Sequence, residues 1–429
     1  MNENESAMTR RGFLSITAAT GAGYALGFHQ RAHGAMIAYP RSAKRPEEEI
    51  IVGLEIGTSK ISAVVAKTRP GGTVVIEGVG NAPSRGIRRG QIVDFERARR
   101  SVMQALVNAV VMSDVMIQSV YIGITGACIS SYNNRGFVLI PEGQEKITKA
   151  DCDNVRDNAL LVFVPPQSMF LHTILQHYYV DGRESGLNPV GMIGQQIEAD
   201  FHIVHGRLAP IENAVRCVKE LSLEVEDVVL NPLATAKAVL DADQRKLGAL
   251  VIDIGGGTTD YLVYVDGAVC ESGSVAMGGD PISRELSSCL SIPPWSAERL
   301  KINEGSVTVG TTLPGKIVTL KNDGDFAPRE VERETLNSII RIRTRQMLEC
   351  VKRRLDTHDV PLKSLGTGVH LTGGYSLLRG IDELAGDVFG IPARRARVKG
   401  VSGPARILDD PRYSCAIGLV KHSHESIFG

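Results

Sequence analysis

The sequence lacks paired cysteines and any excess of charge. Its seven cysteines are scattered, odd in number and form no C-x-x-C pair. This argues against a disulfide framework or a zinc site and for a reducing compartment. Lys and Arg together number 48, as do Asp and Glu, so the formal net charge is zero and no bulk attraction to nucleic acid is expected. With 429 residues, the chain is long enough for two or more domains with separate cores.

The most informative stretch, Leu250–Asp260, matches neither the phosphate loop that ends in Gly-Lys-Ser/Thr nor the G-x-G-x-x-G turn. An apolar run typical of a strand is followed by an acid, three glycines, two threonines and a second acid. Glycine backbone N–H groups can close on phosphate oxygens, and threonine hydroxyls add donors. The predicted phosphate-binding residues are Gly255, Gly256, Gly257, Thr258 and Thr259. Asp253 could hold a hydrated Mg²⁺, although the stretch alone also fits a plain strand–turn–strand.

Val52–Lys60 repeats this pattern upstream, with an apolar strand, an acid, a glycine and hydroxyls. Its predicted site residues are Glu55 for the metal, then Gly57, Thr58, Ser59 and Lys60 for phosphate. Strand character resumes after Lys60, so the loop is expected to be a hairpin tip. Two such hairpins could face each other across a cleft and hold a polyphosphate between them.

A third element, Val369–Leu378, is again a strand followed by a glycine pair. Gly373 and Gly374 would let a purine or ribose lie flat against the backbone, because no Cβ intrudes. Between the second and third elements, Glu298 and Lys301 lie on one face of a predicted helix. They are expected to form an adenosine clasp or, in the plainer interpretation, a surface ion pair.

These elements, in this order, resemble those of the actin and heat-shock-chaperone ATPase superfamily, and within it the family of bacterial cell-division FtsA proteins. The resemblance runs from about Ile50 to Ser426. Beyond the nucleotide loops it includes Pro83–Asp94, Val120–Gly126, Ile147–Asp151, Asn188–Gly194 and Tyr413–Leu419. It implies an α/β, actin-like fold of two ribonuclease-H-like domains around a nucleotide cleft, with an FtsA-type α+β insertion.

The expected domain order combines this resemblance with the residue pattern, which predicts three strands within 51–80 and helices at 95–111 and 332–355. The first actin-like domain is expected at 46–94 and 176–209, and the inserted subdomain at 95–175. The second domain is expected at 210–267 and 326–392. Its small subdomain is placed at 268–325, an N-terminal extension at 1–45 and a return to the first domain at 393–429.

The two termini depart from the family pattern. Thr9–Ser15 and the apolar residues after it have the look of a twin-arginine export signal. A true signal, a membrane anchor and a start codon placed too early all remain open, with export the least favoured. FtsA-like chains usually finish with an amphipathic membrane helix, whereas Lys421–Gly429 is short and polar. The N-terminal segment or a partner would then supply membrane attachment.

The resemblance implies a cytoplasmic protein at the inner membrane, which binds ATP and Mg²⁺ and polymerises with itself. It would link the tubulin-like FtsZ to the membrane and recruit later division proteins. The subdomain at 268–325 would bind the acidic, extended tail of FtsZ through residues such as Arg299 and Asn303. No general base can be named in the sequence, so at most slow ATP hydrolysis is expected. A sugar kinase or polyphosphate-type hydrolase and a pilus-assembly relative are the alternatives.

Overall fold

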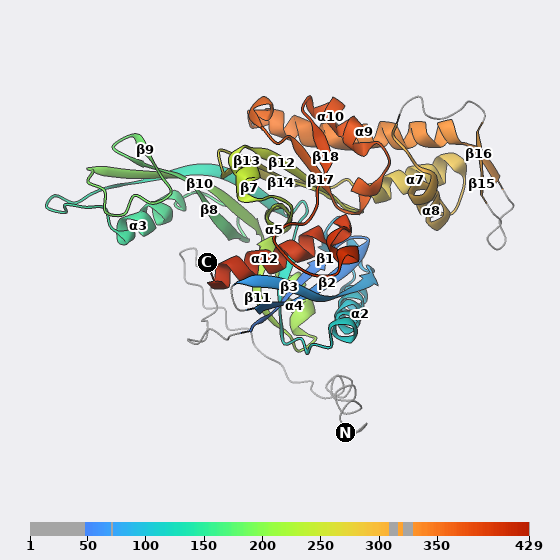
Figure 1. Ribbon diagram of the computed structural model, residues 1–429, viewed down its shortest axis with the longest axis horizontal. Coiled ribbons are helices and arrows are strands. Elements are labelled where there is room, and N and C mark those ends of the chain that lie inside the picture. Colours follow the sequence, from blue (N-terminus) through green and yellow to red (C-terminus); the bar gives the residue numbers. More distant parts are fainter. Residues whose placement is uncertain (1–47, 70–71, 309–315, 321–328, 429) are drawn as a thin grey trace, which may run out of the picture.

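The computed structural model describes residues 48–69, 72–308, 316–320 and 329–428, and two five-stranded sheets of similar design form its centre (Figure 1). In each, a strand that carries an acid near its end forms an antiparallel hairpin with the next strand and pairs in parallel with a later one. The α/β class predicted from the sequence is confirmed. The predicted extension at 1–45 lies outside the described residues.

The first sheet has the strand order β11-β6-β1-β2-β3. Its strands are β1 (Ile50–Ile56), β2 (Lys60–Arg69), β3 (Thr73–Pro83), β6 (Ser119–Ile124) and β11 (Glu224–Leu230). The helices α2 (Phe95–Ser113) and α4 (Leu208–Lys219) pack on one face, and α5 (Asn231–Val239) and α12 (Ser414–Phe428) on the other. Neighbouring β1 residues alternate between these layers: Val52 and Leu54 join the core under α2, and Ile51 packs with α12.

Helix α2 illustrates the local signals. Asp94 caps its N-terminus by accepting a hydrogen bond from the backbone of Arg97, and Asp114 ends the helix in the left-handed conformation. Its buried apolar residues recur every three to four positions. The helix and the three strands predicted nearby are therefore confirmed.

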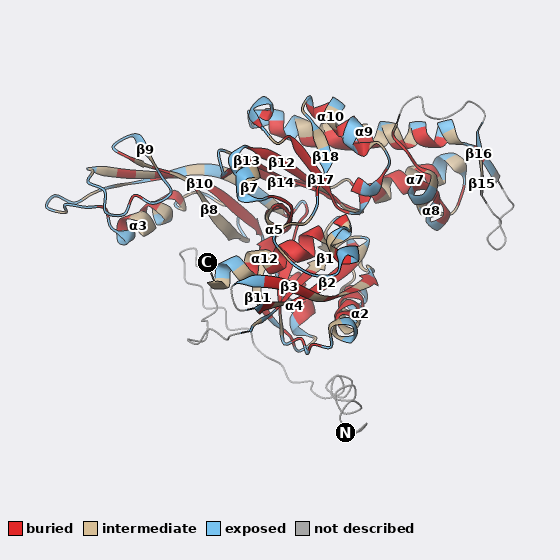
Figure 2. Cartoon of the chain, viewed as in Figure 1, coloured by how far each residue is buried: buried red, intermediate tan, exposed pale blue. Residues whose placement is uncertain are grey.

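The second sheet has the order β14-β13-β12-β17-β18. Its strands are β12 (Ala249–Ile254), β13 (Thr259–Val265), β14 (Ala268–Val275), β17 (Val369–Thr372) and β18 (Ala393–Arg395). One face packs against α9 (Arg333–Thr357) and α10 (Ile381–Phe389), and the other against α5. Helices α5 and α12 pack together between the two sheets, where buried residues are concentrated (Figure 2).

A separate four-stranded sheet, the inserted sheet, extends away from this centre (Figure 1). It consists of β7 (Ile129–Leu139), β10 (Gln196–Arg207), β8 (Ser168–Val180) and β9 (Arg183–Gly186), in that order. Helix α3 (Lys149–Ala159) covers it, and Gly136 allows the approach, since a Cβ there would lie 2.1 Å from Val155 O.

The predicted insertion at 95–175 is wrong at both ends. Helix α2 packs on β2 and β3 of the first sheet, β6 pairs with β1 and β11, and β10 pairs along its length with β7 and β8. The boundaries at 210, 268 and 393 also differ, because α4 and β11 belong to the first sheet and β14 and β18 to the second. The residue pattern marks a buried face, but it does not say which sheet covers that face.

The remaining elements are short or peripheral. Helices α7 (Gly279–Leu290) and α8 (Pro294–Glu304) and the hairpin of β15 (Ile317–Leu320) and β16 (Arg329–Glu332) form the small subdomain. The others are β4 (Ile87–Arg88), β5 (Gln91–Ile92), α6 (Ala242–Lys246), α11 (Ala405–Leu408), and the 3-10 helices η2 (Leu362–Ser364), η3 (Gly374–Leu377) and η4 (Pro411–Tyr413). Within the described ranges, no helix has the length and apolar character needed to cross a bilayer.

Candidate nucleotide-binding site

The tips of the two acid-bearing hairpins lie against each other. The first tip joins β1 to β2, and the second joins β12 to β13. A Cβ atom added at Gly256 would lie 2.8 Å from Ser59 Cβ, and one added at Gly257 would lie 2.6 Å from Thr58 Oγ1. Neither glycine can carry a side chain unless the opposite tip moves. The structure therefore brings the two predicted phosphate loops together.

The second tip is held by the segment that leads into α7. The N–H groups of Gly279 and Asp280 donate to the carbonyls of Gly255 and Gly256, at 3.0 and 2.8 Å. The buried Thr259 hydroxyl donates to a backbone carbonyl of the same segment, 2.9 Å away. Thr259 thus fixes the tip to this segment, while Gly256 and Gly257 face the opposite tip.

Three carboxyl groups meet beneath the tips. Glu55 lies near the end of β1, and Asp253 and Asp260 face each other across the β12–β13 hairpin. Burial raises the pKa of Glu55 to about 7, that of Asp253 to about 6 and that of Asp260 to about 7. Asp253 adds to the shift of the other two by charge repulsion. A buried acidic cluster that resists ionisation is typical of a functional site.

Two threonines from outside the hairpins bind these acids. Thr235 of α5 donates to Asp253 Oδ2 at 3.0 Å, and Thr125, just after β6, donates to Asp260 Oδ1 at 2.5 Å. Glu55 differs, because its Oε2 atom is shielded from solvent and has no hydrogen-bond partner among the described residues.

Lys60, predicted as a phosphate counter-charge, is bound to residues of η4. Its ammonium donates to Ser62 Oγ at 2.5 Å and to the backbone carbonyl of Arg412, and it lies 4.7 Å from the centre of the Tyr413 ring. Burial lowers the pKa of Lys60, although Glu55 opposes this shift. A phosphate would therefore have to compete with these partners for the ammonium.

The predicted adenosine clasp is a partly buried structure. Lys301 is 4 % exposed, and its ammonium donates to Glu298 Oε2 at 2.7 Å and to Gly279 O at 2.9 Å. The same ammonium lies 5.4 Å from the centre of the Tyr375 ring. Because Tyr375 directly follows Gly374, the clasp and the glycine turn lie in one region. The interpretation as a surface ion pair does not hold for Lys301.

The glycine turn itself is tightly constrained. Gly373 has φ +81°, and a Cβ there would lie 2.3 Å from Asp253 Oδ1. Only glycine fits such a position. A Cβ at Gly374 would lie 3.4 Å from Arg412 Cγ, so one side of this residue faces η4.

Arg299 and Asn303, predicted to bind a partner, lie apart from the acids on the outer part of α8, where both are exposed. They share that region with Trp295, whose ring centre is 5.3 Å from Arg299 Cζ. Arg299 and Asn303 thus share α8 with the predicted nucleotide residues Glu298 and Lys301, but unlike Lys301 they are exposed.

Several residues of the site were missed by sequence reasoning. Thr125 lies in Val120–Gly126, a segment that carries the family resemblance, but no spacing rule links it or Thr235 to the acids. Asn231, at the start of α5, is buried with its Oδ1 atom lacking a hydrogen-bond partner among the described residues. Its Oδ1 lies 2.2 Å from the position that a Cβ on Gly123 would take, on the strand next to Glu55.

Comparison with known proteins also distinguishes the inserted sheet from the rest of the chain. Residues 250–418 match the family model "Cell division protein FtsA", and residues 126–205 match "SHS2 domain inserted in FTSA". The second match corresponds closely to the inserted sheet. The FtsA of Neisseria meningitidis serogroup B is 34% identical over 374 residues, covering 87% of this chain and 90% of the relative. The FtsA of Escherichia coli K12 is 32% identical over 389 residues, covering 89% and 92%.

Solved structures share the fold at low sequence identity. A "PilM-PilN type IV pilus biogenesis complex" chain has a TM-score of 0.63 and 15% identity, covering 89% of this chain and 99% of that chain. MreB5 of Spiroplasma citri, solved bound to ADP, has a TM-score of 0.52 and 17% identity, covering 89% and 98%. These similarities confirm the actin-like fold.

The acid cluster predicts a pH-dependent stability. Glu55 has a pKa of about 7 in the folded chain against an ordinary value of 4.5, so the folded state binds the extra proton between these values. The stability that this proton provides is complete below pH 4.5 and is lost as the pH rises through 7. In the nucleotide-free protein, Glu55→Gln should therefore raise the free energy of unfolding by about 1–3 kcal/mol at pH 8 and leave it little changed at pH 4.5.

Denaturant unfolding between pH 4.5 and 8 measures this effect. The control is Glu142→Gln at an exposed loop position, which should follow the wild type at every pH. An equal response of both variants at pH 8 would contradict the assignment of Glu55 to a buried, unfavourably charged position.

Proposed function

Since the chain belongs to the FtsA family of cell-division proteins, we propose that this actin-like protein is an ATP-dependent adaptor of the division apparatus. It binds ATP with Mg²⁺, polymerises, and links FtsZ to the cytoplasmic face of the inner membrane. Family membership supports the role in division. The observation that supports ATP binding is the meeting of two acid-and-glycine hairpins, one from each large sheet, at Ser59 and Gly256.

The tips are close enough to make the nucleotide a conformational clamp. Because side-chain and backbone atoms of the two tips are in contact, a phosphate can enter between them only if the two sheets move apart. ATP would then hold the halves in a new relative position by binding both tips. Thr235 holds Asp253, Thr125 holds Asp260 and Glu55 is assigned to the metal, so none of the described acids of this cluster is left as a base for water attack, and we propose slow hydrolysis.

Glu55 and Asp253 fit a hydrated magnesium ion. The unpartnered Glu55 Oε2 and the raised pKa values of both acids indicate that Lys60 and Thr235 compensate their negative charge only in part. Mg²⁺ prefers oxygen ligands and keeps several waters; when bound, it would neutralise phosphate charge. The described residues contain no group of three or more His, Cys, Asp or Glu side chains that could hold a metal. Glu55 and Asp253 would therefore act through water, with the phosphates as further ligands.

Gly256→Val tests the nucleotide site. The valine side chain would enter the space of Ser59 and Asp280, since a Cβ alone would lie 2.7 Å from Asp280 Oδ1. Binding of Mg²⁺·ATP, measured by calorimetry, should be lost. Gly386→Ala, where the nearest atom is 3.6 Å away, is the control and should bind like the wild type.

Thermal melting without nucleotide shows whether the Gly256→Val chain is folded. Undiminished ATP affinity in the folded variant would defeat the assignment. Steady-state phosphate release at the rate of a metabolic kinase, about 1–100 s⁻¹, would contradict slow hydrolysis.

The outer face of α8 is proposed to bind the acidic tail of FtsZ. Trp295, Arg299 and Ile302 are spaced for one helical face, and Trp295 and Ile302 are 50% and 68% exposed. An exposed aromatic ring, an aliphatic side chain and a guanidinium group suit an extended peptide that carries apolar and acidic residues. Asn303 lies at the edge of this face and accepts a hydrogen bond from Arg379 through its carbonyl.

Charge reversal at this face tests the proposal. Arg299→Glu should weaken binding of a synthetic FtsZ tail peptide by tenfold or more, or about 1.4 kcal/mol, because attraction becomes repulsion. ATP affinity should not change. Arg406→Glu, at an exposed position on α11, is the matched control, and fluorescence anisotropy measures both. Equal peptide affinity in the two folded variants would exclude α8 as the binding site.

The inserted sheet is proposed to contact the next subunit and later division proteins. Its outer part carries exposed apolar side chains, among them Phe137, Leu161, Phe163 and Ile193. Exposed apolar surface of this kind often marks a site of protein–protein contact where it gathers on one face. It suits a protein–protein contact that varies with the state of assembly.

Phe163, 86% exposed, offers the clearest test. Phe163→Asp should prevent ATP-dependent sedimentation of the purified protein, because a buried carboxylate would oppose the contact. Asp153→Asn, on the exposed side of α3, is a control for a change of surface charge. If Phe163→Asp sediments like the wild type, this part of the inserted sheet does not form the subunit contact.

A further inference from the structure

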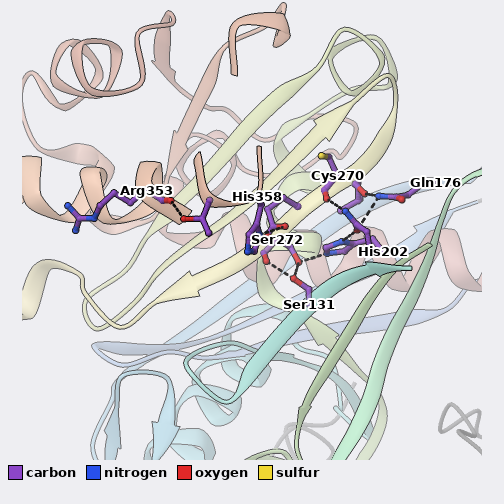
Figure 3. A network of polar contacts seen from close by, with 11 residues as sticks. Ser131, Gln176, His202, Cys270, Ser272, Arg353 and His358 are labelled. Carbon is purple, nitrogen blue, oxygen red and sulfur yellow. Dashed lines mark hydrogen bonds and ion pairs between the residues drawn. The ribbon is translucent and has the colours of Figure 1, made fainter. Parts of the chain in front are cut away.

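The inserted sheet is attached to both halves of the molecule, but in different ways. The first half is the first sheet with its helices, and the second half is the second sheet with its helices. Through the chain the inserted sheet is continuous with the first half, since β7 follows β6 and β10 leads directly into α4. Through side chains it is bound to the second half, where β7 and β8 pack against β14, the edge strand of the second sheet. Figure 3 shows this contact from close by.

Side chains of the inserted sheet occupy the outer edge of β14. Ser131 donates to Ser272 O at 2.8 Å. Asn133 donates to Cys270 O at 2.9 Å, and Gln176 donates to Val269 O at 2.6 Å. These bonds take the place of a further strand on β14. We call this set of residues, together with His202, the seam.

His202 completes the seam. Its Nδ1 atom is 2.7 Å from Asn133 Oδ1, and its Nε2 atom is 2.7 Å from Ser272 Oγ. An amide oxygen can only accept, so Nδ1 carries the proton and Nε2 accepts from Ser272. Burial lowers the pKa of His202 to about 4, which keeps the ring neutral near pH 7. Because His202, Gln176 and Ser272 are buried and hydrogen-bonded, loss of the exposed Asn133 side chain leaves the buried Nδ1–H of His202 without its partner.

The seam begins at the acid cluster. Thr125, which directly follows β6, donates to Asp260 and lies 3.3 Å from Ser274 Oγ on β14. From α9, Arg354 donates to Ser274 O at 2.9 Å, further along the same edge of β14, and the Glu271 side chain pairs with His358 at 2.8 Å on the sheet face opposite Ser272. The strand β14 is thus bound along this edge, and the inserted sheet holds it in register with Thr125 and Asp260.

We propose that Asn133 and His202 are positioning residues for the nucleotide site: the seam ties the two halves together and opposes the separation of the hairpin tips. The proposal rests on the proposed ATP function. A phosphate between Ser59 and Gly256 moves the sheets apart, while the seam favours the arrangement in which the tips touch. Loosening the seam then lowers the cost of nucleotide entry, even though it removes stabilising contacts. By reciprocity, a protein that shifts the inserted sheet changes ATP affinity.

The test uses two neighbouring asparagines of β7. Asn133→Ala removes the centre of the seam. Asn134→Ala removes a hydrogen bond of similar length, 2.8 Å to Ala159 O, within the inserted sheet and its helix. In the nucleotide-free full chain, amide hydrogen exchange in peptides covering 57–60 and 255–260 should be faster in Asn133→Ala than in the wild type or Asn134→Ala. Equal exchange in all three overturns the proposal.

ATP affinity is the second measurement. A variant that only destabilises the fold would not bind ATP more tightly. Asn133→Ala should bind Mg²⁺·ATP about fivefold more tightly than the wild type despite a lower melting temperature, whereas Asn134→Ala should not. Ser131→Ala, which removes one donor of the seam, replaces Asn133→Ala if that chain fails to fold. If the wild type binds ATP and affinity is unchanged or lower in the seam variants, the seam does not oppose separation. If the wild type binds no ATP but amide exchange in the hairpin tips is faster in Asn133→Ala, the role of the seam in holding the tips together is supported and the proposed function fails.

Discussion

The burial of three carboxyl groups where the two halves meet is the constraint on which the rest of the structure depends. Charge in such a place is unfavourable unless nearby groups compensate it, and the compensation comes from distant parts of the chain. Thr235 reaches Asp253 because α5 passes between the two sheets, and Thr125 reaches Asp260 because β6 ends beside β13. Lys60 contributes positive charge to Glu55 while remaining bound to η4. The position of α5, the ends of the strands and the approach of η4 all follow from this one cluster.

The hairpins themselves could be predicted because their signal is local. An apolar run, an acid and glycines specify a strand and a tight tip from neighbouring residues alone, and β1, β2, β12 and β13 all lie where this pattern places them. The same is true of α2, whose cap at Asp94 and apolar periodicity need no tertiary information. That two tips touch is a tertiary fact: the repeated pattern suggested that the hairpins could face each other, and the resemblance to a family added the expectation of a nucleotide cleft.

Sequence reasoning missed the features that depend on which distant segment of the chain an element packs against. The apolar face of α2 could have covered an inserted sheet as well as the first sheet, so its assignment to the insertion was wrong. In β10, residues such as Phe201 and Ile203 follow the alternating apolar pattern of a strand. This pattern does not indicate that the strand pairs with β7 and β8. Lys301 read equally well as a surface residue, and its burial depends on Gly279 and Tyr375, which lie far away in the chain. Contacts between residues so far apart in the chain produce no repeating pattern in the sequence.

The occupied edge of β14 has a consequence for how copies of this chain can associate. An open strand edge invites another chain to add a strand, and such growth leads to aggregates that do not readily come apart. Here the carbonyl groups of Val269, Cys270 and Ser272 already accept side-chain hydrogen bonds. On the outer strand of the inserted sheet, Asn158 in turn accepts from the Phe137 amide. A strand from another copy is thereby excluded from this edge of β14, which leaves side-chain surfaces for contacts between copies.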